Sequence, residues 1–262
     1  MEIKIYQVDA FTNEVFSGNP AAVCPLEQWL DDNIMQKIAM ENNLAETAFI
    51  IKTSSGYNIR WFTPTVEVDL CGHATLAAAH VLFEHENYQG SKIDFFSPRS
   101  GNLTVVKEEN HLTLNFPTDK LIEVPISPQL NSCFQIEANE AYKGKTDYIL
   151  VFGSETEIKA LKPNLKNISD LDARGLVVTA KGDACDFVSR FFGPQSGIDE
   201  DPVTGSAHTS LTPIWAKKLN KSKLSAVQLS ERKGWLMCKD LQDRVEISGS
   251  AKLYLKGTIY LP

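Results

Sequence analysis

The sequence contains no C-x-x-C pair, no apolar run of membrane-spanning length and no long run of charges of one sign. Its five cysteines are odd in number and widely spaced, which predicts free thiols in a reducing compartment. Lys plus Arg number 26 against 33 Asp plus Glu, giving a formal net charge of −7. Nucleic acid and anionic membrane surfaces are therefore poor candidate partners, and we expect neither.

The start of the chain also lacks the apolar segment of a signal peptide. Residues 1–8 (MEIKIYQV) alternate apolar and polar side chains, which is typical of a half-buried strand. We therefore expect a soluble, cytoplasmic protein. One basic cluster, made of Lys217, Lys218, Lys221 and Lys223, follows an apolar stretch, and we interpret it as the cationic end of a helix.

A chain of 262 residues with 43% hydrophobic residues can bury a substantial core. Residues 31–43 carry apolar side chains at helical spacing, with Asp31 or Asp32 as the expected N-cap and Asn42 with Asn43 as the stop. Residues 47–51 are then typical of a strand. Glu46 is therefore predicted to lie at a helix-to-strand junction.

A second helix is predicted from near Gly72 to about His85. Its body is apolar on nearly every face, which indicates a helix enclosed by other structure. Short alternating segments accompany it in the sequence, at residues 57–62, 93–96, 102–107 and 111–116. A central helix wrapped by twisted antiparallel strands is the economical arrangement.

An internal repeat runs through the chain. The string RWFTP at residues 60–64 recurs as RFFGP at residues 190–194, 130 positions later. Each copy is followed by an acidic stretch and then by a small-residue turn that opens an apolar segment. These turns hold Gly72 and Gly205, which are 133 positions apart. An offset so nearly constant, at about half the chain length, predicts two half-domains of one fold.

The junction between the halves is predicted between Pro117 and Cys133, a stretch with several prolines and little periodicity. We assign residues 1–118 to the first half-domain and 119–262 to the second, a division that leaves open that the last strand packs back on the first half. Pro213 lies a few residues into the helix that Gly205 should open. It should kink that helix unless the first turn is irregular.

The two turns predict a binding site for a carboxylate. A glycine with small neighbours at a helix start leaves backbone N–H groups unpaired next to the positive end of the helix dipole. Two such termini, at Gly72 and Gly205, could hold an anionic substrate and stabilise negative charge that develops on it.

Titratable groups accompany both turns, and they suggest proton-transfer chemistry. They are His73, Glu200, Asp201, Ser206 and His208. Glu46 joins them because it stands among apolar neighbours in NLAETAF, where burial would raise its basicity. For Glu46 alone, an exposed loop position or a role in helix capping is the favoured interpretation.

Six short motifs, taken in order along the chain, together resemble those of a known protein family. They are DAF at residues 9–11, GNPAAV at 18–23, NLAETAF at 43–49, RWFTP at 60–64, CGHAT at 71–75 and EDPVTGSA at 200–207. On these motifs the chain resembles the PhzF family of phenazine-biosynthesis-like proteins, within the superfamily of diaminopimelate epimerase. The resemblance covers nearly the whole sequence.

The resemblance implies an α+β fold of two similar half-domains, each a barrel-like, antiparallel-rich sheet around a central helix, with the active site in the cleft between them. It makes Glu46 the general base and places His73 and Asp201 beside it as catalytic residues. Substrate binding is assigned to Gly72, Gly205, Ser206 and Asn19, the last in the GNPAAV motif. A homodimer is implied as well.

The implied reaction is an isomerisation or epimerisation of a small carboxylate-bearing substrate. Glu46 would remove a proton from an activated carbon and return it at another carbon or face, with no metal and no organic cofactor. Epimerases of the superfamily use two cysteines instead. Here Cys71 precedes the first glycine, but no cysteine lies near Asp201, so a two-thiol mechanism is not available.

Three other classes of protein compete with an isomerase. A serine hydrolase lacks support because no G-x-S-x-G motif is present. A metal enzyme is disfavoured because His73, His80 and His85 fall on no common ligand face of one helix. A small-acid binding or interaction protein on the same fold stays open, since sequence does not show turnover.

Overall fold

The alternating pattern at the start of the chain produces strand β1 (Glu2–Ala10) in a computed structural model that describes residues 1–262. The chain divides into two compact units. The first unit comprises Met1–Asn115 and Ser248–Pro262, and the second comprises Phe116–Ile247. None of the helices is long and apolar enough to cross a membrane. The division of the sequence into half-domains 1–118 and 119–262 stays a prediction.

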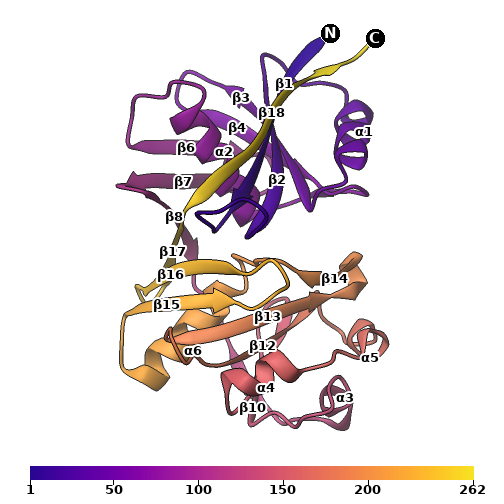
Figure 1. Cartoon of the computed structure of the whole chain (residues 1–262), viewed down its shortest axis with the longest axis vertical. Coiled ribbons are helices and arrows are strands. Elements are labelled where there is room, and N and C mark those ends of the chain that lie inside the picture. Colours follow the sequence, from indigo (N-terminus) through magenta and orange to yellow (C-terminus); the bar gives the residue numbers. More distant parts are fainter. The chain divides into compact units, whose positions relative to one another are not determined.

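The first unit is a twisted sheet with two helices (Figure 1). Its remaining strands are β2 (Asn19–Leu26), β3 (Glu46–Lys52), β4 (Tyr57–Phe62), β5 (Glu67–Val68), β6 (Lys92–Ser97), β7 (Gly101–Glu108), β18 (Ala251–Tyr260) and β8 (His111–Pro117), which leads out of the unit. Its helices are α1 (Asp32–Asn42) and α2 (Gly72–Glu84). The yellow β18 pairs antiparallel with the indigo β1 along its whole length, so the end of the chain completes this sheet.

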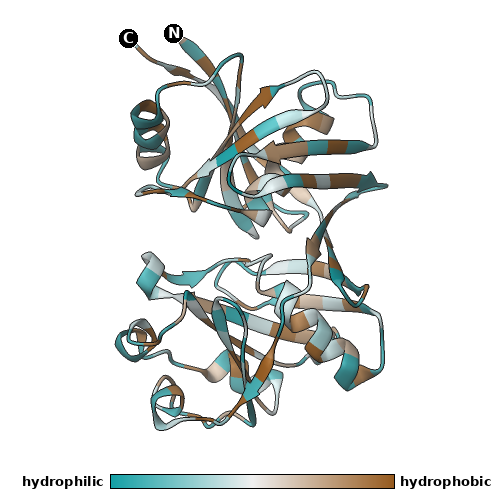
Figure 2. Ribbon diagram, turned by 180° about the vertical axis from the view of Figure 1, so that it is seen from behind, coloured by the Kyte–Doolittle hydropathy of each residue, from teal (hydrophilic) through white to brown (hydrophobic).

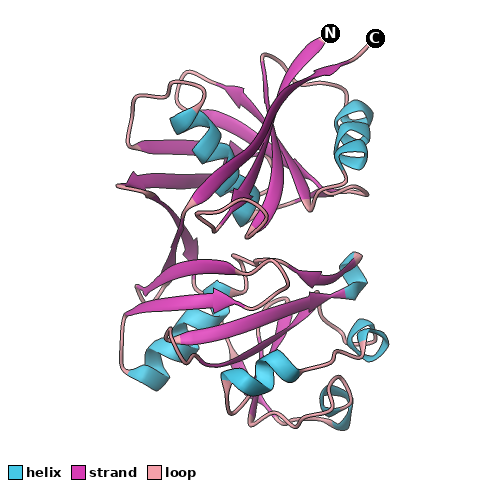
Figure 3. Cartoon of the chain, viewed as in Figure 1, coloured by secondary structure: helices cyan, strands magenta, loops and turns pink.

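Both helices of the first unit begin and end where the sequence predicts. The Asp31 side chain caps α1 by accepting a hydrogen bond from the Asn33 backbone N–H, and Asn43 ends the helix in the left-handed conformation. Helix α2 packs against β1, β2 and β3 and is surrounded by strands in Figure 3. Nine of its thirteen residues are buried, three of them consecutive alanines whose small side chains allow the sheet to approach closely.

The second unit repeats this arrangement. Its strands are β9 (Ile122–Val124), β10 (Glu140–Lys143), β11 (Asp147–Val151), β12 (Gly175–Lys181), β13 (Phe187–Gly193), β14 (Ile198–Asp201), β15 (Lys223–Gln228), β16 (Gly234–Asp240) and β17 (Arg244–Gly249). Its helices are α3 (Pro128–Asn131), α4 (Glu155–Ala160), α5 (Leu165–Ser169), the 3₁₀ turn η1 (Pro194–Ser196) and α6 (His208–Leu219). Many strands of both units alternate apolar and polar segments, as expected when one face is buried (Figure 2).

Strand pairing shows the repeat directly. In the first unit β1–β2 is antiparallel, β2–β3 parallel, β3–β4 antiparallel and β4–β6 parallel. In the second unit β10–β11, β11–β12, β12–β13 and β13–β15 follow the same sequence of directions. One helix joins β2 to β3, whereas the two short helices α4 and α5 lie between β11 and β12.

The repeated RWF and RFF strings hold equivalent ion pairs. Arg60 on β4 donates two hydrogen bonds to Glu67 at 2.7 and 2.8 Å, and its guanidinium lies over the Phe62 ring. Arg190 on β13 donates two to Glu200 at 2.8 and 2.9 Å and lies over the Phe192 ring. The matched strings therefore mark the same structural position in each unit.

The start of α6 differs from the prediction. Gly205 was expected to open it, but α6 begins three residues later, at His208. Ahead of it, the backbone N–H groups of His208 and Thr209 bond to the carbonyls three residues back, which is a tighter turn than an α-helix. This irregular first turn is the condition under which Pro213 was expected to be tolerated, and Pro213 lies inside α6. Lys217 and Lys218 occupy its last turn, as interpreted from the sequence.

Candidate active site

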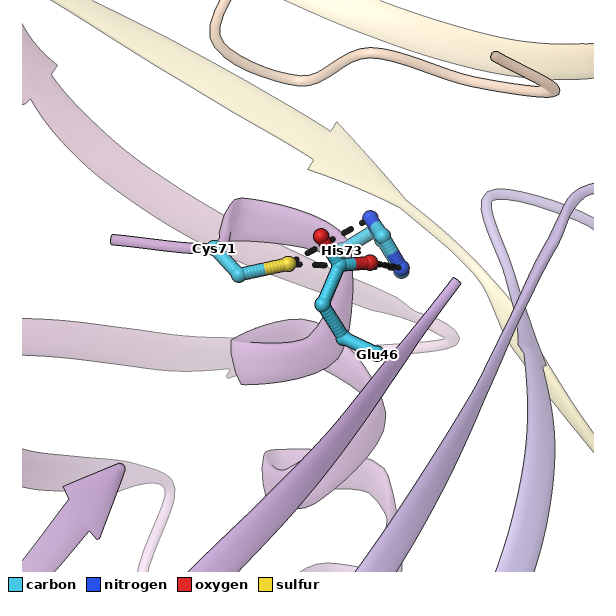
Figure 4. A group of neighbouring side chains, drawn as sticks. All are labelled: Glu46, Cys71 and His73. Carbon is cyan, nitrogen blue, oxygen red and sulfur yellow. Dashed lines mark hydrogen bonds and ion pairs between the residues drawn. The ribbon is translucent and has the colours of Figure 1, made fainter. Parts of the chain in front are cut away.

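Glu46 and His73 form an ion pair at the start of two neighbouring elements of the first unit. Glu46 is the first residue of β3, and His73 is the second residue of α2. Their Oε2 and Nε2 atoms are 3.0 Å apart, with side chains only 13% and 7% exposed (Figure 4). The two side chains meet because β3 packs against α2.

The His73 ring is held on its other side as well. Asn19, fully buried at the start of β2, places its Nδ2 atom 3.3 Å from His73 Nδ1. Contacts at both ring nitrogens fix the orientation of the ring, with Nε2 paired to the Glu46 carboxylate. Burial alone would lower the pKa of His73, but the charges of Cys71 and Glu46 and their hydrogen bonds outweigh it and raise the pKa well above 6.5.

Cys71 completes the cluster in Figure 4. It is the N-cap of α2 and makes no side-chain capping bond, while its Sγ lies 3.5 Å from His73 Nδ1 and 4.0 Å from Nε2. Burial, together with the charge of Glu46, raises the pKa of the thiol. The Cys71 thiol therefore gives up its proton less readily than an exposed cysteine does.

The N-terminus of α2 has no side-chain cap. Gly72 is the first residue of the helix, and no side chain caps it. The backbone N–H groups of the first turn carry the positive end of the helix dipole, so a carboxylate placed there would be stabilised. The predicted roles of Gly72 and His73 therefore fall on one local structure.

The remaining predicted residues lie in the second unit. Asp201 is buried at the end of β14, where the Thr204 hydroxyl donates to its Oδ2 and Gln228 Nε2 donates to its backbone carbonyl at 2.8 Å. Ser206 Oγ accepts a hydrogen bond of 3.1 Å from Arg174. Gly205 lies in the tight turn before α6. That these residues meet Glu46 and His73 over one substrate stays a prediction.

Several residues around these positions carried no sequence signal. Arg174 donates to Asp147 as well as to Ser206. Burial lowers the pKa of its guanidinium, but the hydrogen bond to Asp147 and the charges of Asp147, Asp201 and Asp119 outweigh burial and raise that pKa. Gln228 receives the Thr204 N–H at 2.8 Å. Thr204 could have been found, since it stands inside the EDPVTGSA motif, whereas Arg174, Asp147 and Gln228 belong to none of the six motifs.

Two units, each a sheet around a helix and each with the same order of strand pairings, define an epimerase-like fold. A hydroxyproline epimerase from Agrobacterium vitis shares it with a TM-score of 0.60 at 10% identity, over 98% of this chain and 92% of its own. The defining pattern of the family described as phenazine biosynthesis-like protein, PhzC-PhzF, matches residues 8–257. The chain belongs to this family.

Near relatives support the same conclusion. A protein of Pseudomonas aeruginosa named as an uncharacterized isomerase is 50% identical over 261 residues, covering 100% of both chains. The crystal structure of a PhzF-family phenazine biosynthesis protein from Enterococcus faecalis matches with a TM-score of 0.97 and 47% identity, again over 100% of both chains. The predicted family and fold class are confirmed, and the isomerase class is supported by the names of relatives.

Proposed function

We propose that this protein is a cofactor-independent isomerase that moves a proton on a small carboxylate-bearing substrate, with Glu46 as the general base. The observation that carries the proposal is the 3.0 Å contact between Glu46 Oε2 and His73 Nε2 in a largely buried setting. A carboxylate shielded from water and held in a fixed position is what proton abstraction from carbon requires. The isomerase names of relatives support the reaction class.

Each group in the cluster has a separate task in this proposal. His73 occupies Glu46 Oε2, which leaves Oε1 to take the proton from the substrate carbon. The protonated carboxyl then returns the proton at a different carbon or face, with no net change in charge. The amides at Gly72 stabilise the negative charge that spreads onto the substrate carboxylate as the C–H bond breaks.

The other predicted residues enter as assisting groups. Asp201 would act as an acid, base or hydrogen-bond partner, Gly205 and Ser206 would bind the substrate, and Asn19 would contribute through its contact with the His73 ring. A homodimer belongs to the proposal as well.

Deuterium exchange tests the proposal whichever product the reaction forms. A panel of small carboxylic acids would first be screened for a rise in melting temperature, since a ligand that binds only the native state stabilises it. Acids that bind would be incubated with the protein in deuterated water and followed by NMR for deuterium on carbon. Incorporation by the wild-type protein is the expected result.

The decisive variant is Glu46→Gln. Its amide oxygen can still accept from His73, so the fold should survive, while the exchange rate should fall by about 10²–10⁴-fold with the loss of the base. Glu86→Gln is a matched control, because Glu86 is a part-buried carboxylate of the same unit bound to Tyr6 and Lys4. Exchange at the wild-type rate in Glu46→Gln would overturn the assignment, and acids that bind without any exchange would indicate a binding protein.

A further inference from the structure

Three metal-ligating side chains converge at the site. One ligand atom from each of Glu46, Cys71 and His73 lies within 4.8 Å of the others. Thiolate, imidazole and carboxylate are the three side-chain groups that bind zinc in proteins. Proton transfer by Glu46 does not use the thiol, so its place beside the base is unexplained by the proposed reaction.

The distances fit tetrahedral coordination. With zinc–ligand bonds of about 2.0–2.3 Å, neighbouring ligand atoms are about 3.3–3.6 Å apart. Here Glu46 Oε2 and His73 Nε2 are 3.0 Å apart, and Cys71 Sγ and His73 Nε2 are 4.0 Å apart. The ligand atoms of Glu46 and Cys71 lie within 4.8 Å of each other, so movements of up to roughly 1 Å would bring all three atoms into a zinc coordination sphere and leave a fourth position open.

Charge and support also favour a divalent cation. Once the cation has displaced the protons of Cys71 and His73, a carboxylate, a thiolate and a neutral imidazole carry two negative charges, so one divalent cation makes the buried cluster neutral. Cys71 is fixed because its carbonyl accepts from both the N–H and the hydroxyl of Thr75, at 3.1 and 2.6 Å. Asn19 contacts Nδ1 of the ring, which leaves Nε2, the nitrogen that faces Glu46, to bind the cation.

We propose that Glu46, Cys71 and His73 form an inhibitory site for zinc or a similar divalent cation. Bound metal occupies the lone pairs that would take the substrate proton, and the protons displaced from the ligands pass to solvent. The metal is here an inhibitor rather than a cofactor. Its effect on turnover rests on the proposed role of Glu46, whereas metal binding itself does not.

Cobalt(II) tests binding independently of activity. Added to tag-free protein, one equivalent of Co²⁺ should produce the near-ultraviolet absorption of thiolate-to-cobalt charge transfer, and Zn²⁺ should abolish it by displacement. Cys71→Ser should lose this absorption. Cys185→Ser, which removes a half-buried thiol in the second unit, should keep it. No absorption in the wild-type protein, or absorption that survives in Cys71→Ser, overturns the site.

Deuterium exchange with and without Zn²⁺ tests inhibition. The exchange rate of the wild-type protein should fall on adding Zn²⁺ and recover with a chelator. Cys71→Ser should need at least about tenfold more Zn²⁺ for the same fractional loss of its own zinc-free exchange rate. Cobalt absorption together with zinc-insensitive exchange overturns the inhibitory role. A protein that binds cobalt through Cys71 but exchanges no acid contradicts the proposed function and leaves the metal site intact.

Discussion

His208 shows how burial can outweigh a hydrogen bond in setting the charge of a residue. Its ring is fully buried, with Nδ1 2.9 Å from the Thr204 carbonyl and with Nε2 lacking a hydrogen-bond partner. Burial lowers the pKa of His208 to about 4, so the ring stays neutral in the folded protein. In the unfolded chain a histidine has an ordinary pKa of about 6.5.

This difference predicts a loss of stability in mild acid. Below about pH 6.5 this histidine binds a proton in the unfolded chain but not in the native state. The free energy of unfolding therefore falls as the pH drops towards 4, by up to about 3 kcal/mol. Urea unfolding at pH 7.5 and at pH 5 measures the drop. His208→Asn should show a smaller drop, while His80, whose pKa is also lowered to about 4, keeps its share. An unchanged drop in His208→Asn would contradict the assignment.

At the scale of elements, the internal repeat in the sequence corresponds to a repeated contact, the Arg–Glu ion pair found in each unit. Arg190 binds Glu200 with two hydrogen bonds and also donates to the carbonyls of Ile158 and Leu161, at 3.1 and 3.0 Å. It therefore joins β13 and β14 to the end of α4. Its side chain is 13% exposed and that of Glu200 26% exposed, so solvent screens this pair only in part.

Arg190→Met should therefore lower the free energy of unfolding by about 1–3 kcal/mol, because Glu200 and two carbonyls lose their donor. Lys166→Met is the control, since Lys166 and its partner Asp170 are 83% and 58% exposed and such pairs contribute little. Equilibrium urea unfolding compares both variants with the wild-type protein. Equal effects of the two substitutions would show that the repeated pair is not a stabilising feature.

Local signals made much of the fold predictable. Asp31 and Asn43 are residues that cap helices by their own side-chain and backbone chemistry, and both ends of α1 fall where they stand. The repeat was visible because Arg60 and Arg190 serve the same contact. The start of α6 was missed, since whether Gly205 opens a helix depends on a turn geometry that several residues decide together.

The sequence predicted those residues of the candidate site that lie within short motifs, but it did not predict their contacts. Glu46 and His73 were named from motifs, and their contact depends on the packing of β3 on α2, which a motif does not encode. Arg174 beside Ser206 was missed because it comes from the loop before β12, 32 positions away. Long-range contacts of this kind have no periodic signature.

For the whole molecule, the predicted homodimer is the property open to the simplest test. Strand β18 exposes Tyr254, Leu255 and Tyr260, with 48%, 43% and 74% of their surfaces accessible. Apolar side chains exposed together on one strand are typical of a surface that a partner covers. Light scattering across a range of concentrations should give about twice the 29.1 kDa of one chain, and a single-chain mass throughout would refute the dimer.

Because β18 pairs with β1, the sheet of the first unit cannot close until β18 has been synthesised. About 130 residues of the second unit are translated between the two segments of the first. At roughly 5–20 residues per second this delay is about 7–26 s. On the ribosome the second unit is complete before the sheet of the first can close, so the half that carries Glu46 and His73 is the last to mature. A nascent chain released before β18 is translated would leave β1 without this partner strand.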